Sequence, residues 1–489
     1  MWNSFCRIFS PAEPKPEDSS MGNTSKKLAA KCALLTKDEQ KYMASTFRQA
    51  SRSSERVREE DLIVSGKIDP ESLEKLWGPQ IDPRLAQYLL NYLFGPPARR
   101  QPTCDFNKFA ELYVYNIRGT VEEKMQVVAS SLGSDQAQEI QYQLLREYCE
   151  SIVSTYVRMI KSSNHPNPAK WIEKGFRGKA SNVQALGETV AAGVHQDMDN
   201  PATACTSDQI YRWVQSNTLL QGMSELVFEN LYGMHEQRER TMSVVEEQRP
   251  EQHAQNAQPS LLPFPEGIDP LPDYPAFIDL AHIVWLNSNL PRQHQHKWRF
   301  LFSSHIHGES FSTMAGRIQD VGPSLVIIED NAGYIFGGYA SQPWTLSPNF
   351  YGTDESFLFT LAPKMRVYPA TSYNDHYQYM NFQTKTLPNG LMMGGQFDFG
   401  GIWVNADPFG TGTSTDACST FRGYKRLSKE TSFKIRSLEV WGVGDKPLSV
   451  KESDERDTSI LDRNPEAKAI LDMAGRTRHS EGIREPPAL

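Results

Sequence analysis

The sequence predicts an α+β protein: an all-helical N-terminal half, a β-sandwich-like domain with flanking helices, and a short C-terminal helix. In the first half, apolar residues recur at helical spacing between residues that cap helices. After about residue 290, short apolar runs alternate with turn sequences. Seventeen of the 32 glycines lie between Gly308 and Gly444, as many short strands joined by tight turns require.

Length and composition favour packed domains and exclude some function classes. A chain of 489 residues exceeds one compact core and predicts about two or three domains. The net charge of −8, without a basic stripe, argues against nucleic-acid binding. The six cysteines are scattered and form no C-x-x-C pair, which predicts free thiols in the cytosol. We find neither a transmembrane-length apolar run nor the h-region of a signal peptide.

The N-terminal half divides into a polar segment and a helical domain. Residues 1–30 are polar and predict a disordered N-terminus. Residues 31–234 carry repeated helix-start signals: Thr36 with Glu39, Thr120 with Glu123, and the dipeptides Asp69-Pro70 and Asp82-Pro83. Further helices are expected at about 135–161 and 207–232.

A change of composition separates the two halves. Residues 235–273 are rich in Gln, Pro and Glu, which predicts a flexible linker. The β domain is expected at 274–445, opening with a helix at about 274–289. Asn331-Ala332-Gly333 predicts a hairpin turn between two strands. In the last strand, the apolar parity shifts after Ile435 to Leu438 and Val440, which indicates a β-bulge.

The tail, 446–489, contains a candidate docking helix at about 465–474. Asn464 with Pro465 predicts its start and Gly475 its end. Such a helix is shorter than the ~12–15 residues needed for marginal stability alone, so its apolar face must be covered. That face carries Ala467, Ile470, Leu471 and Ala474. A partner protein or the neighbouring β domain would serve, and the polar spacer 446–457 favours the partner.

The β half resembles the TLDc family. The motifs, in the family's order, are His296–Ser304, Gly308–Phe311, Ile328–Asp330, Phe336–Ala340, Phe357–Phe359, Gly400–Val404 and Leu438–Gly442. The resemblance implies a two-sheet antiparallel β-sandwich, roles in oxidative or nutrient stress, and binding to the vacuolar proton-pumping ATPase. Met21–Asn23 and His479–Gly482 match one branch of the family more narrowly. For that branch the resemblance implies support of mTOR signalling and mTOR complex partners at the lysosome.

The helical half resembles a degenerate pair of EF-hands. Calcium needs carboxylates at alternate loop positions and a final Glu. The segment Gly95–Pro102 offers arginines and prolines instead, and the earlier loop, Ser51–Asp69, lacks the required acidic pattern. We therefore expect no calcium site, no other metal and no cofactor.

Several polar groups are candidates for catalysis or metal binding. Glu329-Asp330 is interpreted as a pair of solvated turn acids, because adjacent strand residues point to opposite faces. His305-x-His307 would share one face if extended, with His294-x-His296 nearby, but no further metal ligands cluster there. Asp375-His376 has no recognisable nucleophile beside it. We therefore predict no catalytic residue.

Met21-Gly22 resembles an N-myristoylation start, with Gly22 as the acceptor if translation begins at Met21. Lys26, Lys27 and Lys31 would then add an electrostatic membrane signal. An ordinary polar tail is the alternative.

We therefore predict a non-catalytic adaptor of the cytoplasm and, peripherally, the lysosomal membrane. An oxidation-resistance protein with weak enzymatic activity is one alternative. A stress-response transcriptional or scaffold role without membrane contact is another.

Overall fold

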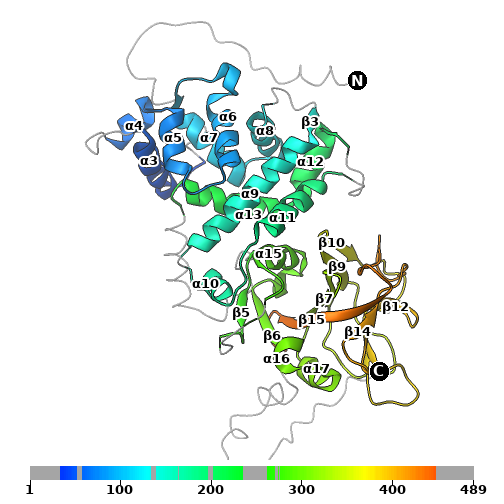
Figure 1. The fold of residues 1–489 in the computed structure, drawn as a ribbon. Helices are drawn as coiled ribbons and strands as arrows, with labels where there is room; N and C mark the ends of the chain where they lie inside the picture. The colour runs from blue at the N-terminus through cyan, green and yellow to red at the C-terminus, as the bar shows by residue number, and fades with distance from the viewer. Residues whose placement is uncertain are drawn as a thin grey trace, which may run out of the picture. The chain divides into compact units, whose positions relative to one another are not determined.

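The computed structural model describes residues 34–51, 58–133, 139–163, 165–195, 202–234, 261–269, 274 and 276–447. The chain forms two compact units, the first mainly from residues up to 296 and the second mainly from residues beyond. The first is helical and the second is built on an antiparallel β-sheet (Figure 1). The α+β class is thus confirmed.

The first part of the helical unit contains a short antiparallel ladder between two of its loops. Strand β1 (Lys67–Ile68) pairs with β2 (Cys104–Asp105). Its helices are α3 (Lys37–Ser51), α4 (Glu59–Ser65), α5 (Pro70–Trp77), α6 (Pro83–Phe94), η1 (Pro97–Arg99) and α7 (Phe106–Arg118).

The second part repeats this plan. Strand β3 (Glu139–Gln141) pairs with β4 (Ala204–Thr206). Its helices are α8 (Val121–Ser131), α9 (Tyr142–Ser162), α10 (Pro166–Glu173), α11 (Ala180–Ala192), α12 (Ser207–Ser216) and α13 (Thr218–Leu231). The ladders were not predicted, because two or three residues are too short for strand periodicity to show. The single helix expected at 207–232 is divided at Asn217, whose side chain accepts from Leu220 N and caps α13.

The predicted helix starts are confirmed by their hydrogen bonds. Asp69 caps α5 and Asp82 caps α6, each followed by a proline at the first helical position. Thr120 and Glu123 form a reciprocal capping box at α8. Thr36 and Glu39 make the same two bonds before α3. Each cap satisfies backbone N–H groups that a helix leaves without an internal partner.

An aromatic cluster fills the core between α5, α7 and the end of α13. The buried Tyr232 ring lies 4.5 Å from Phe109 and 5.6 Å from Trp77, centroid to centroid. Its hydroxyl donates to Phe109 O at 2.7 Å, and Trp77 Nε1 donates to Leu231 O at 3.0 Å. The chain end of α13 is therefore held in the first part of the unit by both burial and hydrogen bonds.

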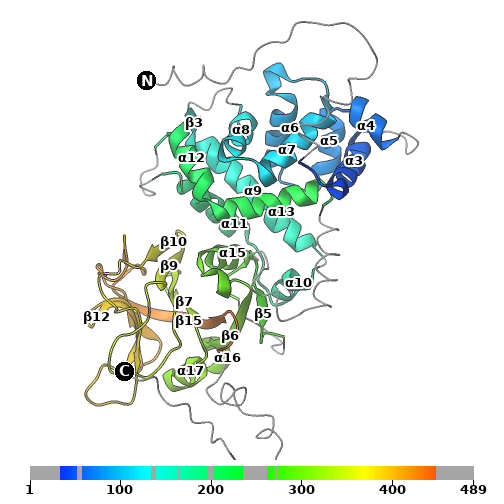
Figure 2. The same ribbon diagram turned by 180° about the vertical axis from the view of Figure 1, so that it is seen from behind.

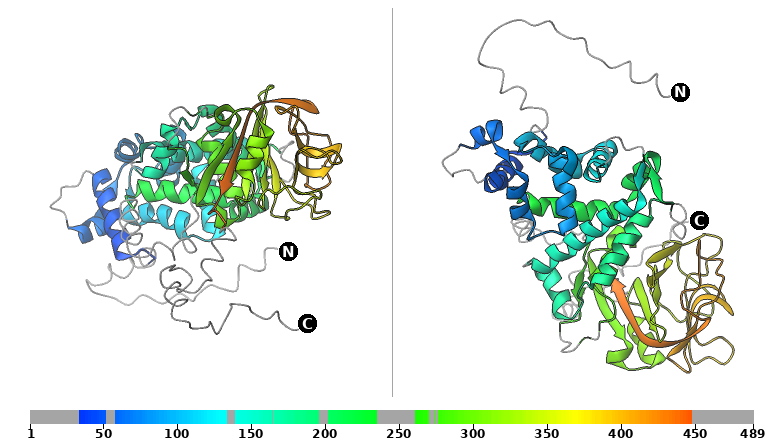
Figure 3. Two further views of the ribbon diagram at one scale, coloured as in Figure 1. Left: turned by 90° about the horizontal axis from the view of Figure 1, so that it is seen from below. Right: turned by 45° about the horizontal axis from the view of Figure 1, so that its top comes forward.

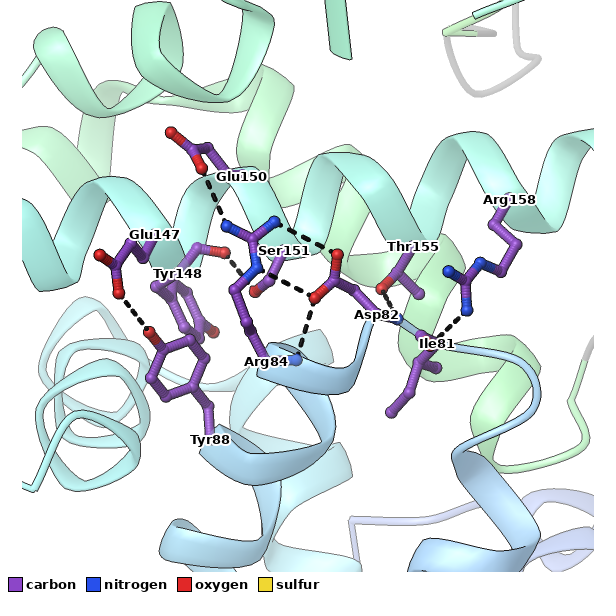
Figure 4. A network of polar contacts seen from close by, with 10 residues as sticks. All are labelled: Ile81, Asp82, Arg84, Tyr88, Glu147, Tyr148, Glu150, Ser151, Thr155 and Arg158. Atoms are coloured by element: carbon purple, nitrogen blue, oxygen red, sulfur yellow. Dashed lines mark hydrogen bonds and ion pairs between the residues drawn. The ribbon is translucent and has the colours of Figure 1, made fainter. Parts of the chain in front are cut away.

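A polar network joins α6 to α9 (Figure 4). The Arg84 guanidinium donates to Asp82 at 3.1 Å and to Glu150 on α9 at 2.9 Å. Farther along α9, Thr155 Oγ1 accepts from Asp82 N at 2.9 Å, and Arg158 donates to Ile81 O at 2.6 Å. One face of α9 thus holds the whole N-terminal turn of α6.

Helix α9 also packs closely on α11, and Figures 1 and 2 show α9, α11 and α13 side by side. A Cβ at Gly187 of α11 would lie 2.5 Å from Glu150 Cα, well inside contact distance. Only glycine permits this approach, so Gly187 allows close packing within the second part of the helical unit, while the α6–α9 network joins the two parts.

The segment expected to be a flexible linker is packed where the structure describes it. Strand β5 (Phe264–Glu266) lies in residues 261–269, beside α10. Trp171 Nε1 donates to Pro263 O at 2.7 Å and Asn167 Nδ2 to Leu262 O at 2.8 Å. Buried Trp171 and half-buried Asn167 of α10 find their acceptors in this backbone, so residues 261–269 are structural.

Helix α15 (Leu280–Asn289) belongs to the helical unit and is tied to α11 through Asp279. This buried carboxylate accepts from Lys179 N and Asn182 Nδ2, both at 2.8 Å, and also from the first N–H groups of α15. Burial lowers the pKa of His282 against the opposing charge of Asp279, so this capping partner is held neutral. One carboxylate therefore satisfies donors at the start of two helices.

The sheet of the second unit follows one hydrogen-bonded path, β10-β9-β8-β7-β15-β14-β13-β12-β11, and β6 also pairs with β15. The strands are β6 (Lys297–Ser303), β7 (Ser324–Asp330), β8 (Ile335–Ala340), β9 (Phe357–Ala362), β10 (Arg366–Pro369), β11 (Tyr379–Asn381), β12 (Gly390–Gln396), β13 (Phe399–Asn405), β14 (Thr411–Thr413) and β15 (Ser432–Val443). Short helices η2 (Arg292–His294), α16 (Ser304–His307) and α17 (Phe311–Ile318) flank β6 along the chain. The predicted hairpin at 331–333 joins β7 to β8.

The strands join in a single hydrogen-bonded path through β15, and the face-to-face packing of two sheets stays a prediction. This strand pairs with β14, β7 and β6, and Figure 3 shows it as a long curved orange arrow. Its register with β7 shifts between Ile435 and Ser437, which confirms the predicted bulge, and its register with β6 shifts at Val440/Trp441. Bulges bend a strand, so one strand serves both halves of the sheet.

We predict that Asp82→Ala lowers the free energy of unfolding by about 1–2 kcal/mol at pH 7, because it removes the α6 cap and an Arg84 contact. Asp82→Asn keeps a capping side chain and serves as the matched control for charge. Burial acts to raise the pKa of Asp82, but hydrogen bonds from Arg84 outweigh it and leave the pKa below its ordinary 3.8. The ionised carboxylate therefore stabilises the fold above about pH 4, and this contribution is lost as pH falls through the lowered pKa.

Calorimetric melting of the full chain from pH 7 to pH 3 tests this. The melting temperatures of wild type and Asp82→Asn should converge in acid. A constant difference across that range, or a wild-type-like Asp82→Ala, would contradict the assignment.

Candidate functional site

The adjacent acids at the end of β7 have different roles. Asp330 is 1% exposed, accepts from Ser428 Oγ at 2.5 Å and from Ala332 N at 2.9 Å. Glu329 is partly exposed and lies 3.4 Å from Arg436 on β15. The interpretation of both as solvated turn acids is wrong for Asp330. Its carboxylate joins the β7–β8 turn to the loop that contains Ser428.

The histidine pair does not form a metal-binding face. His305 and His307 lie on helix α16 rather than on an extended strand, so an i, i+2 spacing turns them apart. His307 Nδ1 accepts from Ser303 N at 3.1 Å, and its ring stacks on Phe300 and Phe302. Burial, followed by the charge of Arg317, lowers the pKa of His307. In residues that the structure describes, no group of three or more His, Cys, Asp or Glu could hold a metal ion.

Asp375 and His376 do not form an oriented acid–base pair. The Asp375 carboxylate is 85% exposed and lies 4.0 Å from His376 Nε2, beyond hydrogen-bond distance. His376 Nδ1 instead lies 2.7 Å from Gly395 O, and its ring stacks on Phe350 at 4.3 Å. The histidine therefore holds a loop against the sheet.

A thiol–imidazole pair was missed from sequence. Cys205 Sγ lies 4.0 Å from His195 Nε2, and both side chains are buried. Burial raises the pKa of Cys205 to about 11 and lowers that of His195, so both groups stay neutral at pH 7. A protonated, buried thiol is a poor nucleophile, and the pair is structural. Its members lie ten residues apart, His195 after the end of α11 and Cys205 on β4, a spacing that carries no motif.

The loops expected to lack calcium chemistry are occupied by protein contacts. Helix α4 takes up the loop before β1, while η1 takes up the loop before β2. In the latter, Arg100 donates to Asn91 Oδ1 at 3.2 Å. The positively charged guanidinium thus lies in a loop where calcium binding requires carboxylates.

The remaining predicted sites lie outside the described residues. These are Gly22, with the start at Met21, and the tail face Ala467, Ile470, Leu471 and Ala474. Within the part of the chain that the structure describes, no helix has the length and apolar character to cross a membrane.

The family model for the TLDc domain matches residues 272–444, from the segment before α15 to the end of β15. The fold and the matched region thus define a TLDc-domain protein.

Relatives extend the match beyond this domain. MTOR-associated protein MEAK7 of Xenopus laevis is 34% identical over 391 residues, which cover 77% of this chain and 80% of the relative. MTOR-associated protein MEAK7 of Homo sapiens is 43% identical over 216 residues, 44% of this chain and 46% of the relative. Nuclear receptor coactivator 7 of Mus musculus is 34% identical over 178 residues, 36% of this chain and 18% of the relative. The chain belongs to the family of MTOR-associated MEAK7 proteins.

We predict that the full chain takes up no calcium with submillimolar affinity, because its loops offer prolines and arginines instead of clustered carboxylates. Isothermal titration calorimetry to millimolar calcium should show only dilution heat, with a calcium-loading EF-hand protein as the positive control. A saturable heat below 1 mM, or a calcium-dependent rise in melting temperature, would contradict this prediction.

Proposed function

We propose that this protein is a non-catalytic adaptor of the mTOR pathway that works peripherally at lysosomal membranes. Its TLDc domain would bind the vacuolar proton-pumping ATPase, as the family resemblance implies. The observation that carries the proposal is the match to relatives named MTOR-associated, which extends over 80% of a relative and far beyond the TLDc domain. The mTOR-related part of the proposal rests on those names.

The state of the candidate reactive groups supports an adaptor over an enzyme. Asp330 and His376 are hydrogen-bonded into loops, and His307 is stacked between two phenylalanines. The thiols of Cys104, Cys149 and Cys205 are buried, and burial raises the pKa of each. The hydrogen bonds, ring stacking and buried thiols of these residues stabilise the fold. Catalysis by the same residues would require breaking these contacts.

The helical unit supports the role of an EF-hand-like scaffold without calcium. Each ladder, β1–β2 and β3–β4, joins two loops that lead directly into helices, as in paired EF-hands. An EF-hand loop ends on a bidentate Glu in the first turn of the following helix. The third helical residues here are Ser72, Lys108, Leu144 and Gln209. We infer two EF-hand-like pairs, one at each ladder, whose loops contribute to packing instead of binding calcium.

Affinity isolation of the tagged full chain with lysosomal membranes, followed by mass spectrometry, tests the adaptor role. Pump subunits and mTOR components should be enriched over a parallel isolation with the tag alone. The oxidation-resistance alternative instead requires turnover by the purified protein that is lost in Glu329→Gln or Asp375→Asn. Such turnover, or recovery of neither assembly, would replace the adaptor proposal. Cell fractionation separates it from a scaffold without membrane contact.

We predict that membrane association depends on translation from Met21 and on Gly22. The chain started at Met21 should sediment with membranes, and Gly22→Ala should shift most of it to the soluble fraction, since one acyl chain and nearby lysines act together. The chain started at Met1 is the matched control and should be mainly cytosolic. Equal sedimentation of the Met21 form and Gly22→Ala would show that acylation is not the anchor.

We predict that Ile470→Asp with Leu471→Asp abolishes binding to the pump while leaving the melting temperature of the TLDc domain nearly unchanged. Two charges on the apolar face of the proposed tail helix prevent it from entering an apolar groove. Lys468→Asp, at a position that helical spacing places outside the apolar face, is the control for added charge. Loss of domain stability in the double variant would indicate a helix packed on its own domain, and intact binding would remove its docking role.

A further inference from the structure

Two aromatic side chains of the second unit are unusually exposed. Tyr373 is 83% exposed and Phe399 is 65% exposed, the highest values for large apolar side chains in the described ranges. Both are large residues whose exposure to water is unfavourable, about 25 cal/mol per Å² of apolar area. A folded sheet domain that leaves two of them uncovered presents a surface suited to binding.

The loops that carry these aromatics meet at one residue of β12, Gly395. Thr420 Oγ1 accepts from Gly395 N at 2.8 Å and donates to Asn374 Oδ1 at 2.8 Å. His376 Nδ1 lies 2.7 Å from Gly395 O. Phe399 opens β13 and pairs with Gln396 across the turn from β12. The loop of Tyr373 and the hairpin of Phe399 are thus attached to the same backbone segment.

The two loops are backed by a packed aromatic layer, so they form a preorganised surface. Phe350 stacks on His376 at 4.3 Å and packs against Phe397 at 5.1 Å. The residues before the exposed aromatics, Ser372 and Asp398, have φ of +56° and +73°, a left-handed conformation that costs energy outside glycine. Loops fixed in this way lose little entropy when a partner binds.

The charge of this region is acidic. The converging segments 371–376, 396–399 and 416–420 contain Asp375, Asp398 and Asp416, and they contain no Lys or Arg. Asp416 is 3.0 Å from Arg426, whereas Asp375 is 85% exposed and Asp398 is exposed. A face of aromatic rings and carboxylates attracts cations through both charge and cation–π interaction. It repels the anionic headgroups of a cytoplasmic leaflet.

We propose that Tyr373, Asp375, Asp398 and Phe399, the aromatic–aspartate surface, dock a protein segment that presents an Arg or Lys beside an apolar side chain. The apolar side chain packs on the rings, and the cation lies between them and the carboxylates. This deepens the proposed function, because it names the surface through which the TLDc domain would bind its protein partner.

Purified full-length chain and detergent-solubilised vacuolar proton-pumping ATPase provide the first test. Tyr373→Ala with Phe399→Ala should weaken binding about tenfold or more, as expected for aromatic hot spots. Asp375→Asn with Asp398→Asn should weaken binding and reduce its salt dependence, and Asn tolerates the left-handed backbone at 398. Leu346→Ala, which changes a 44%-exposed apolar side chain outside these segments, and Glu430→Gln should bind like wild type. Melting temperatures of all variants should match wild type.

Photo-crosslinking in cells separates this inference from the choice of partner. With p-benzoylphenylalanine at position 373, the adduct should map to a protein peptide that contains Lys or Arg next to an apolar residue, and position 346 should not give it. If wild type fails to bind the pump but gives such an adduct with another protein, the pump proposal fails and the surface stands. The docking proposal would be overturned if crosslinking gives no adduct, an adduct with an acidic peptide or an adduct with lipid. It would also be overturned if the Tyr373/Phe399 variant binds the pump as well as wild type does.

Discussion

Strand β15 is the constraint on which the sheet of the TLDc domain depends. Its twelve residues pair with β14, β7 and β6. Without this strand, the two halves of the sheet would not be connected by hydrogen bonds. A Cβ at Gly442 would lie 2.8 Å from the Arg299 guanidinium. That buried arginine donates to Gly444 O at 3.0 Å and Val321 O at 2.7 Å. The glycine of the Trp441-Gly442 motif therefore makes room for a charge whose hydrogen bonds hold the end of the strand.

The helical unit is held together by comparable means. Arg84 links the caps of the first part to α9, and Gly187 lets α11 approach α9 at van der Waals distance. Asp279 then joins the start of α11 to α15, although α15 lies within the TLDc match. A cut at the start of that match would separate Asp279 from its donors at Lys179 and Asn182. The boundary of the sequence family and the boundary of the packed unit therefore differ.

Buried carboxylates and exposed aromatic side chains occupy different places in the described residues. Buried carboxylates such as Asp279 and Asp330 have several donors each, which compensate for the loss of water. Tyr373 and Phe399 are left exposed on loops held by internal hydrogen bonds. In the described residues, these two carboxylates serve packing, whereas these two aromatic side chains reach the surface.

Local sequence determined the features that depend on neighbouring residues. The caps at Asp69 and Asp82, the turn at 331–333 and the bulge after Ile435 each need only a few adjacent residues, and all were predictable. Strand β12 is not predictable from local sequence, because its glycines and methionines carry no strand pattern. Single-path connectivity, burial of Asp330 and the meeting of two loops at Gly395 were decided by tertiary structure. Each depends on residues tens of positions apart, whose hydrogen bonds exist only after the sheet has brought the strands together.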